Sequence, residues 1–426
     1  MKNIYKIKEY GSFICEKQVE GYITLPQRTF DQLQDFILYN RSKDTDALEI
    51  MGLSARKGLG MVITAKNYVG VICMKDGTTI EILPKIFSAV EEDPHGKREK
   101  KLLVDMLKTL RNSPYKNLQM TNVNTAQMNL FEIFIRMFID EVFFIVKRGL
   151  KSNYETLEEN TSFFKGKLLF SQQIRHNHTH MERSYVQYDA FTVNRPENRL
   201  IKSTLQYLYR LSTSSKNRSD IKVLLTSFAD VKESTNYKAD FAKYTPDRNT
   251  KDYTTALRWC EVFLSGKSFT SFAGSDVAYA LLFPMETLFE SYVAHLLRKQ
   301  LNGAEYSVST QDKRFHLFDE PGKRFLIKPD IVVKRNSDQV VFVLDTKWKL
   351  LSENKPNYGI SQADMYQMYA YQKKYGAEKI ILLYPTTTDI ASKKQIRFKS
   401  DDGVKIEVRF IDLFDARTSI QTIEFA

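Results

Sequence analysis

Residues 328–349 constrain the fold more than any other stretch, because they read as two strands joined by a tight turn. Two apolar runs flank a polar tetrapeptide at 335–338, which is the pattern of a β-hairpin. The midpoint between Asp330 and Asp345 falls inside that turn, so antiparallel pairing places these two aspartates opposite each other. Lys347 follows Asp345 by two positions and therefore shares its face of the strand.

Two carboxylates and a lysine at the open end of a hairpin suit metal-dependent phosphodiester hydrolysis. Magnesium takes oxygen ligands, usually one or two carboxylates together with water and substrate phosphate. The ion lowers the pKa of a bound water and offsets charge on the scissile phosphate. A nearby lysine can orient or deprotonate that water, or stabilise developing negative charge. The alternative is an ordinary hairpin with an exposed ion pair, which accounts for most Asp-x-Lys tripeptides.

The Pro-Asp at 329–330 and the Asp-Thr-Lys at 345–347 resemble the PD-(D/E)xK motif of a nuclease superfamily. A helix is expected next, since residues 361–364 fit an N-terminal capping signal and a glycine later ends the pattern. Gln367 and Tyr371 lie one turn apart on that helix and are similar to the Q-x-x-x-Y element of the RecB-like branch. A plain amphipathic helix is the alternative for this element alone.

The chain is expected to be a multidomain α+β protein, because 426 residues exceed one ordinary core. Residues 1–96 read as a β-rich domain that binds a partner, and residues 97–265 as a helical domain with a β excursion. Residues 276–426 hold the hairpin within an α/β PD-(D/E)xK nuclease domain built on a mixed sheet. The segment 91–96 reads as a linker and the segment 266–275 as a connector.

The net charge indicates the class of binding partner, and the cysteine content indicates the cellular compartment. Lys and Arg number 63 against 51 Asp and Glu, and the net charge of +12 favours a polyanionic partner. A basic protein without such a partner is the alternative. Three widely spaced cysteines indicate a reducing cytoplasm rather than a disulfide framework. No apolar signal core begins the sequence, and charges interrupt the most apolar helix, so no membrane span is expected.

Two further features are candidate metal sites. Glu290 lies on an expected amphipathic helix at 284–301 and could reach the hairpin as another metal ligand, or be a solvated helix charge. His176, His178 and His180 alternate, so on a strand they would share one face and form a metal tripod. A polar hairpin face or a nucleic-acid contact is the favoured interpretation of these histidines.

The sequence contains no complete nucleotide-binding motif. Gly266-Lys267-Ser268 suggests a phosphate-binding loop, but Glu261 stands where the Walker pattern requires glycine. No Rossmann fingerprint occurs either. The chain is therefore expected to bind no nucleotide, and a partner must supply any energy that its action needs.

Several stretches together resemble McrC, the nuclease subunit of modification-dependent McrBC restriction systems. The resemblance spans about residues 60–385 and adds three upstream segments to the nuclease motif. These are T-I-E-I-L-P-K-I at 79–86, K-G-K at 165–167 followed by I-R-H-N at 174–177, and N-R-L-I-K at 198–202.

The resemblance implies a cytoplasmic endonuclease that cuts modified double-stranded DNA. It also implies docking on a hexameric AAA+ GTPase, McrB, with stimulation of GTP hydrolysis and self-association only within that assembly. Asp330 and Asp345 would hold Mg²⁺, with two ions possible, and Lys347 would assist attack by water. Gln367 and Tyr371 carry over as further catalytic residues.

Residues 150–169 read as a protruding hairpin or loop, which we hypothesise enters the central pore of that ring. Two other function classes stay open on the sequence. A RecB-like nuclease acting with a helicase or alone would share the same catalytic residues. A non-cleaving adaptor that activates an AAA+ motor would not need Asp345 for its biological activity.

Overall fold

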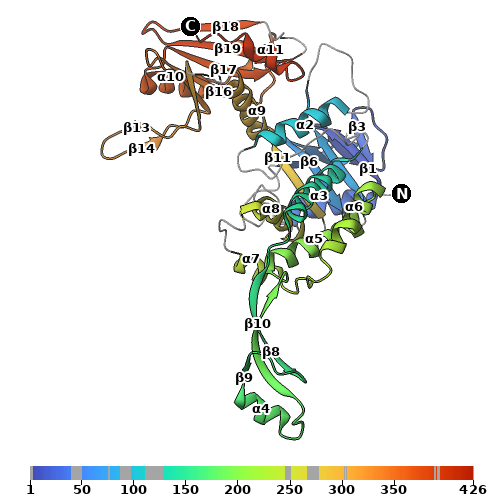
Figure 1. Cartoon of the computed structure of the whole chain (residues 1–426). Helices are drawn as coiled ribbons and strands as arrows, with labels where there is room; N and C mark the ends of the chain where they lie inside the picture. The colour runs from blue at the N-terminus through green and yellow to red at the C-terminus, as the bar shows by residue number, and fades with distance from the viewer. Residues whose placement is uncertain are drawn as a thin grey trace. The chain divides into compact units, whose positions relative to one another are not determined.

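The computed structural model describes residues 3–39, 50–74, 77–86, 97–110, 128–244, 251–265, 278–301, 303, 305–387, 390 and 394–425. The linker expected at 91–96 and the connector at 266–275, including Gly266-Lys267-Ser268, lie outside them. The chain forms two compact units, residues 1–130 with 268–426 and residues 131–267 (Figure 1). The three-domain division stays a prediction, because one compact unit can contain more than one domain.

Two four-stranded sheets form the N-terminal part of the first unit. Their strands are β1 (Ile4–Lys8), β2 (Ser12–Cys15), β3 (Tyr22–Leu25), β4 (Met51–Arg56), β5 (Gly60–Ala65), β6 (Tyr68–Met74), β7 (Thr79–Leu83) and β11 (Ala278–Pro284). One sheet has the order β1-β7-β6-β11 and the other β3-β2-β5-β4. Helix α1 (Gln27–Tyr39) places Phe30, Leu33 and Phe36 at helical spacing, and these side chains are buried in one core with both sheets.

Strand β11 comes from a distant part of the sequence and completes the N-terminal sheet. It pairs antiparallel with β6, from Ala278 opposite Met74 to Pro284 opposite Tyr68. Gly70 lies in this pairing with a φ of +139°, and a Cβ there would overlap the carbonyl oxygen of Leu281. Only glycine allows this close approach of two backbones. The sequence analysis places no strand at these positions.

The C-terminal part of the first unit is a mixed six-stranded sheet with the order β12-β15-β16-β17-β19-β18. Strands β16, β17 and β19 run parallel to one another and the remaining pairs are antiparallel. The strands are β12 (Tyr306–Thr310), β15 (Ile331–Arg335), β16 (Val341–Thr346), β17 (Lys379–Pro385), β18 (Gln395–Lys399) and β19 (Lys405–Ile411). The central strands are buried along nearly their whole length, as expected for parallel strands covered on both faces.

Helices and a small ribbon complete the first unit. Helix α10 packs Met368, Tyr371 and Tyr375 into the core of the six-stranded sheet. Strand β11 leads directly into α9, whose first residue follows the last residue of the strand. The elements are α2 (Lys97–Thr109), α9 (Met285–Gln300), β13 (His316–Phe318), β14 (Arg324–Leu326), the 3-10 helix η5 (Pro356–Gly359), α10 (Gln362–Tyr375) and α11 (Ala416–Gln421).

The second unit combines a helical body with a long hairpin. Its helices are α3 (Leu130–Arg148), α4 (Phe170–Asn177), α5 (Pro196–Leu211), α6 (Ser215–Ser227), α7 (Tyr237–Lys243), η4 (Lys251–Tyr253) and α8 (Thr254–Ser265). Strand β8 (Asn153–Thr161) pairs antiparallel with β10 (Ser184–Thr192), and β9 (Lys167–Leu168) adds to β10. The excursion expected from the sequence is therefore a three-stranded ribbon carrying α4.

The mixed α+β class expected from the sequence is confirmed. The helices expected at 284–301 and after 361 are present as α9 and α10, and Ser361 caps α10 while Gly376 ends it in the left-handed conformation. No helix in the described ranges is both long enough and apolar enough to cross a membrane.

We predict that Gly70→Ala disrupts the pairing of β6 with β11. The added methyl group must displace backbone, so the free energy of unfolding should fall by about 2 kcal/mol or more. Urea unfolding followed by circular dichroism measures this change. Gly52→Ala in β4 is the matched control, because its nearest neighbour is the flexible Lys66 side chain at 3.7 Å and its backbone is unstrained. Equal effects of the two substitutions would contradict the prediction.

Candidate active site

The hairpin expected from the sequence is formed by β15 and β16. Its register pairs Ile331 with Leu344, so the next opposed positions are Asp330 and Asp345. Both aspartates line one cleft of about 430 Å³ at the open end of the hairpin. The structure thus brings the two carboxylates together as the hairpin spacing predicts, while their chemical role stays a prediction.

The Asp330 carboxylate is held by hydrogen bonds from Thr346 and Gln311. Its Oδ2 accepts hydrogen bonds from the Thr346 amide at 2.8 Å and from the Thr346 hydroxyl at 2.7 Å. Gln311 donates through Nε2 to Glu290 Oε1 at 2.5 Å and lies 3.4 Å from Asp330 Oδ1. Glu290, on α9, therefore reaches the mouth of the hairpin. Burial raises the pKa of Asp330, although the two Thr346 hydrogen bonds oppose that rise.

Asp345 is buried and carries the most perturbed carboxyl of the cleft. Burial raises its pKa to about 7, and the negative charge of Asp330 adds to the rise. Its Oδ2 accepts no hydrogen bond from the described residues and has the Lys347 ammonium 2.7 Å away as an ion-pair partner. Burial alone would lower the pKa of Lys347, but the charges of Asp345, Asp364 and Asp330 raise it. The lysine is therefore cationic near neutral pH.

Gln367 and Tyr371 on α10 are joined to Lys347 by hydrogen bonds. Lys347 Nζ donates to Gln367 Oε1 at 3.1 Å, and Gln367 Nε2 donates to the Tyr371 hydroxyl at 2.6 Å. Asp364, in the first turn of the same helix, lies 3.8 Å from Lys347 Nζ. Burial, with the charge of Asp345, raises the pKa of Tyr371. Four of the five residues predicted as catalytic are therefore connected, from Asp345 through Lys347 and Gln367 to Tyr371, and Asp330 lines the same cleft.

Some residues in or next to the cleft were not predicted from the sequence. Gln311 follows β12, a short half-exposed strand whose partner β15 lies more than fifteen positions away, so no local pattern marks it. Asp364 carries a signal only as part of the helix cap. Besides Asp364, the lining residues that the sequence did not indicate as site residues are Glu286, Thr287, Lys328, Thr346, Trp348 and Lys349.

The donors of this cleft fit a hard divalent cation. Asp330, Asp345 and Glu290 offer carboxylate oxygens, and the buried Oδ2 of Asp345 has the Lys347 ammonium as its charged partner. Across the described residues, no group of three or more His, Cys, Asp or Glu side chains is placed to enclose a metal ion. A metal site in this cleft would therefore use few protein ligands and leave coordination positions for water and substrate phosphate. Mg²⁺ is usually bound in this way.

The three histidines do not share a strand, so the condition for the alternative of a metal tripod is not met. His176 lies in α4 and stacks on Tyr185 with ring centroids 5.4 Å apart. His178 ends that helix, and His180 Nδ1 lies 3.2 Å from Glu182 Oε1. A helix turns alternate side chains to different sides, so the period-two argument for a metal tripod fails.

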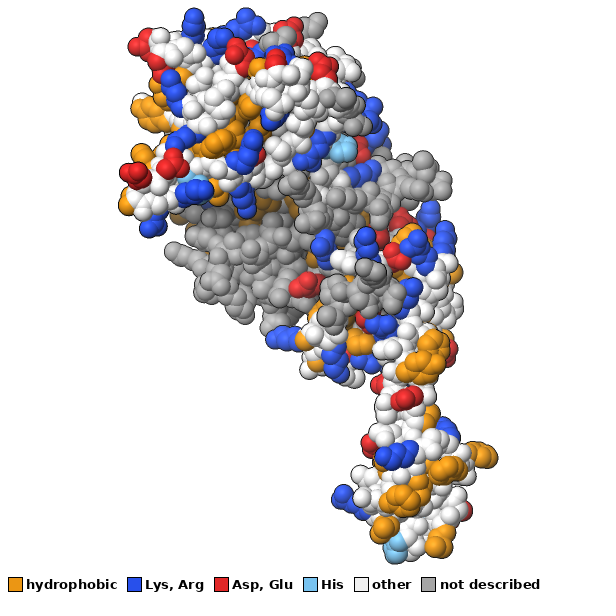
Figure 2. Space-filling view, turned by 60° about the vertical axis from the view of Figure 1, so that its left-hand side comes forward, with side chains coloured by type: hydrophobic (Ala, Val, Ile, Leu, Met, Phe, Trp, Pro, Cys, Tyr) orange, Lys and Arg blue, Asp and Glu red, His pale blue; other side chains and the backbone are white. Residues whose placement is uncertain are grey.

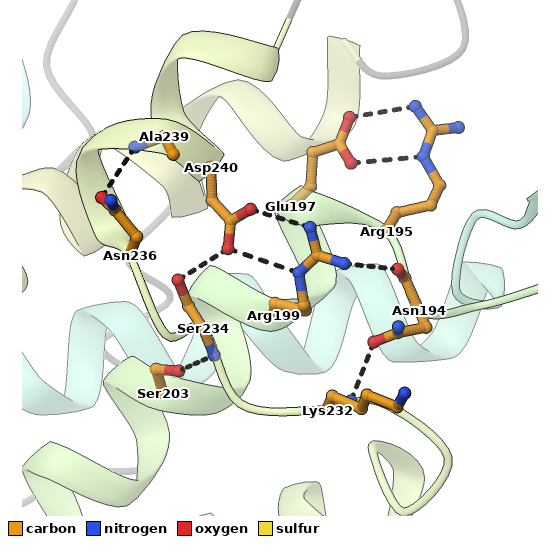
Figure 3. Close-up of polar contacts among 10 residues, drawn as sticks. All are labelled: Asn194, Arg195, Glu197, Arg199, Ser203, Lys232, Ser234, Asn236, Ala239 and Asp240. Carbon is orange, nitrogen blue, oxygen red and sulfur yellow. Dashed lines mark hydrogen bonds and ion pairs between the residues drawn. The ribbon is translucent and has the colours of Figure 1, made fainter. Parts of the chain in front are cut away.

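The N-R-L-I-K segment of α5 fixes the base of the β8–β10 ribbon. Asn198 donates to the carbonyl of Lys151, just before β8, at 3.1 Å and to that of Val193, just after β10, at 2.7 Å. Arg199 pairs with Asp240 at 2.8 Å and also donates to the Asn194 carbonyl (Figure 3). At the base of the ribbon, the segments flanking β8 and β10 are therefore both bound to one helix.

The far end of the ribbon exposes large apolar side chains. Figure 2 shows hydrophobic residues gathered on the protrusion formed by β8, β9, β10 and α4. Phe163 is 77% and Phe164 67% exposed, and the others are Phe170, Ile174 and Met181. Asn177 holds α4 to this end through two hydrogen bonds with Asn160, at 2.8 and 2.9 Å. A soluble surface rarely exposes so many large apolar side chains together unless they bind something.

Trp348 connects the cleft to the N-terminal sheet of the same unit. Its indole Nε1 donates to Glu9 Oε1 at 3.0 Å, and the Lys85 amide donates to Glu9 Oε2 at 2.9 Å. Glu9 is buried, and burial raises the pKa of its carboxyl to about 7. The residue after Lys347 is thus anchored by an ionisable group from the start of the chain.

Comparison with known proteins gives one family and two solved structures. The family model described as McrBC 5-methylcytosine restriction system component matches residues 63–385. The chain is similar to one in the refined half-complex from the tetradecameric assembly of Thermococcus gammatolerans McrB AAA+ hexamers with bound McrC. That match has 19% identity, covers 98% of each chain and has a TM-score of 0.68. The cryo-EM structure of the Thermococcus gammatolerans McrBC complex matches at 19% identity over 70% of this chain and 88% of that one, with a TM-score of 0.50. Curated proteins give no match.

We predict that Glu9 makes stability fall as pH rises toward neutrality. The pKa of this carboxyl is about 7 in the folded chain against 4.5 unfolded, so the folded state binds the proton more tightly between these values. The free energy of unfolding should therefore drop across this window, by up to about 3 kcal/mol, and then level off.

Urea unfolding of the wild type, Glu9→Gln and Glu20→Gln from pH 4.5 to 8 measures this contribution. The difference between wild type and Glu9→Gln should shrink or reverse as pH rises, while Glu20→Gln, an exposed control, should follow the wild type. Parallel curves for all three proteins would contradict the assignment of this pH dependence to Glu9.

Proposed function

Because this chain belongs to the family of McrBC 5-methylcytosine restriction system components, we propose that it is the subunit that cuts DNA. The observation that carries the proposal is the shared cleft of Asp330, Asp345 and Lys347 at the end of one hairpin. The proposed reaction is hydrolysis of a phosphodiester bond in modified double-stranded DNA. The strand pairing and the following helix support assignment to the PD-(D/E)xK nucleases.

Asp330 and Asp345 are the proposed protein ligands of Mg²⁺, and Glu290, which lines the same cleft, is proposed as a further ligand that binds through a water molecule. When bound, the ion supplies positive charge at the scissile phosphate and acidifies a water molecule. One or two ions are compatible with this proposal. The exposed cations Lys328 and Lys349, which line the same cleft, would receive the neighbouring phosphates.

Lys347 is proposed to act as a cation rather than as a base. Its raised pKa keeps the ammonium protonated, so it orients the attacking water and neutralises charge that develops on the phosphate. Gln367 holds the ammonium in place, and the Tyr371 hydroxyl fixes the orientation of the Gln367 amide. Gln367 and Tyr371 are thus positioning residues for Lys347.

The proposed partner is a McrB-like AAA+ GTPase hexamer whose hydrolysis this chain stimulates. The structure that the chain resembles along nearly its full length is described as McrB hexamers with bound McrC. The β8–β10 ribbon is the proposed docking element, since its far end exposes Phe163 and Phe164 and its base is fixed by Asn198. The ribbon end would enter the central pore of the ring, and the nucleotide would be bound by the partner alone.

We predict that Asp330→Ala, Asp345→Ala and Lys347→Ala each reduce DNA cleavage by more than about a hundredfold. The assay is cleavage of methylated plasmid with the AAA+ partner, GTP and Mg²⁺, and co-purification checks partner binding, which should be unchanged. Asp338→Asn is the matched control, since it lies in the turn of the same hairpin and pairs with Arg335. Retained cleavage by Asp345→Ala would favour the adaptor function, and full cleavage without the partner a stand-alone nuclease.

We predict that Phe163→Ser/Phe164→Ser lowers stimulation of the partner's GTPase by about tenfold or more. Deleting 150–169 is a poorer test, because it removes β8 and leaves β10 unpaired. Phosphate release by the partner at saturating chain concentration gives the readout. Val223→Ser on α6 removes a comparably exposed apolar side chain and should have little effect. Undiminished stimulation by the double variant would exclude the ribbon end as the docking element.

A further inference from the structure

A second ribbon, formed by β13 and β14, projects from the C-terminal part of the first unit (Figure 1). Its strands pair His316 with Leu326 and Phe318 with Arg324. Only three residues separate the end of β14 from Asp330. Arg324 is six positions before Asp330, so its backbone lies at most about 21 Å from that aspartate. This span is shorter than one helical turn of B-form DNA, about 34 Å.

The base of this ribbon is fixed to α10, the helix that carries Gln367. The rings of Phe315 and Tyr375 meet edge to face with centroids 4.7 Å apart. The Tyr375 hydroxyl donates to Asp312 at 2.9 Å. A further contact lies at the turn, where Lys374 Nζ is 3.2 Å from Oδ2 of Asp319, the residue after β13. The direction of the ribbon is therefore set by the same helix that positions the catalytic lysine.

The free part of the ribbon combines exposed aromatic rings with unneutralised cations. Phe318 is 55% and Phe325 73% exposed, and their rings contact each other with centroids 6.0 Å apart. Lys323 and Arg324 are exposed and form no ion pair with any described residue. Two acidic residues lie at the turn, Asp319 and Glu320. Asp319 is neutralised by Lys374, so Glu320 is the acidic residue that opposes the charge of these cations. These rings and cations are therefore accessible to another molecule.

We propose that the β13–β14 ribbon is a DNA-binding arm that enters the major groove beside the scissile phosphate. A two-stranded ribbon with its side chains fits the major groove, about 12 Å wide, but not the minor groove, about 6 Å wide. Lys323 and Arg324 contact phosphates along the groove, and Phe318 and Phe325 contact the base edges. This inference rests on the proposed nuclease function for its choice of ligand, but it concerns residues that take no part in hydrolysis.

The arm predicts two separable losses of DNA affinity. Lys323→Ala/Arg324→Ala removes two phosphate contacts, so binding should weaken by about tenfold and the slope of log affinity against log salt should fall by about 2. Phe318→Ala/Phe325→Ala should weaken binding by at least about fivefold with the salt slope unchanged, because apolar contacts release no counterions.

Fluorescence anisotropy of the full-length chain on a labelled duplex of about 30 base pairs, from about 50 to 200 mM salt without divalent metal, measures both quantities. Lys57→Ala/Lys101→Ala is the control for charge, since both lysines are exposed and lie away from the nuclease sheet in sequence. Its affinity should fall by much less than that of the arm variant. Unchanged melting temperatures show that the variants are folded.

Three results would overturn the arm: no duplex binding by the wild type, equal affinities of the wild type and both arm variants, or losses confined to single-stranded DNA. Cleavage separates this outcome from failure of the proposed function. If Asp345→Ala abolishes cleavage while the arm variants bind and cut like the wild type, the proposed nuclease function is supported and the proposed DNA-binding arm is excluded. If Asp345→Ala cuts normally while the arm variants lose binding, the chain binds DNA through the arm without being the nuclease.

Discussion

Two carboxylates that repel each other are held side by side in this chain, and the sheet around them makes that possible. Asp330 and Asp345 face each other because the β15–β16 register leaves them no other position. Burial and mutual repulsion raise the pKa of Asp345 toward neutrality, which shows the cost of the arrangement. The apolar strands next to the aspartates offset this cost, since each buried Val, Ile or Leu stabilises the fold by about 1.5–3 kcal/mol. A cation between the carboxylates would relieve the same repulsion.

Two consecutive residues after the end of β16 connect the cleft to the rest of the first unit. Lys347 points into the cleft toward Asp345 and Gln367, whereas Trp348 donates to Glu9 of the N-terminal sheet. Strand β11 belongs to that same N-terminal sheet and leads directly into α9, which carries Glu290. The N-terminal sheet therefore supports two different walls of the cleft. A change in that sheet has a direct physical route to the position of the lysine.

The sequence revealed those parts of the site that depend on local pattern. The hairpin and α10 follow from alternation, a turn, a capping serine and a terminal glycine, all within about fifty residues. Strand β11 and Gln311 could not be found this way, because each needs a partner far along the chain. The same holds for Glu9, whose contact with Trp348 spans 339 positions. The histidine segment was misassigned because a short polar run does not distinguish helix from strand.

Both projecting ribbons follow one structural rule, although they differ in sequence and in proposed ligand. A narrow ribbon buries few apolar side chains, and a two-stranded one such as β13–β14 is marginally stable in water. Each ribbon is instead held at its base, by Asn198 on α5 in one case and by Tyr375 on α10 in the other. A clamp at the base sets the direction of a ribbon while leaving its end uncovered. The exposed phenylalanines at both ends are the surfaces through which we propose that the two ribbons contact other molecules.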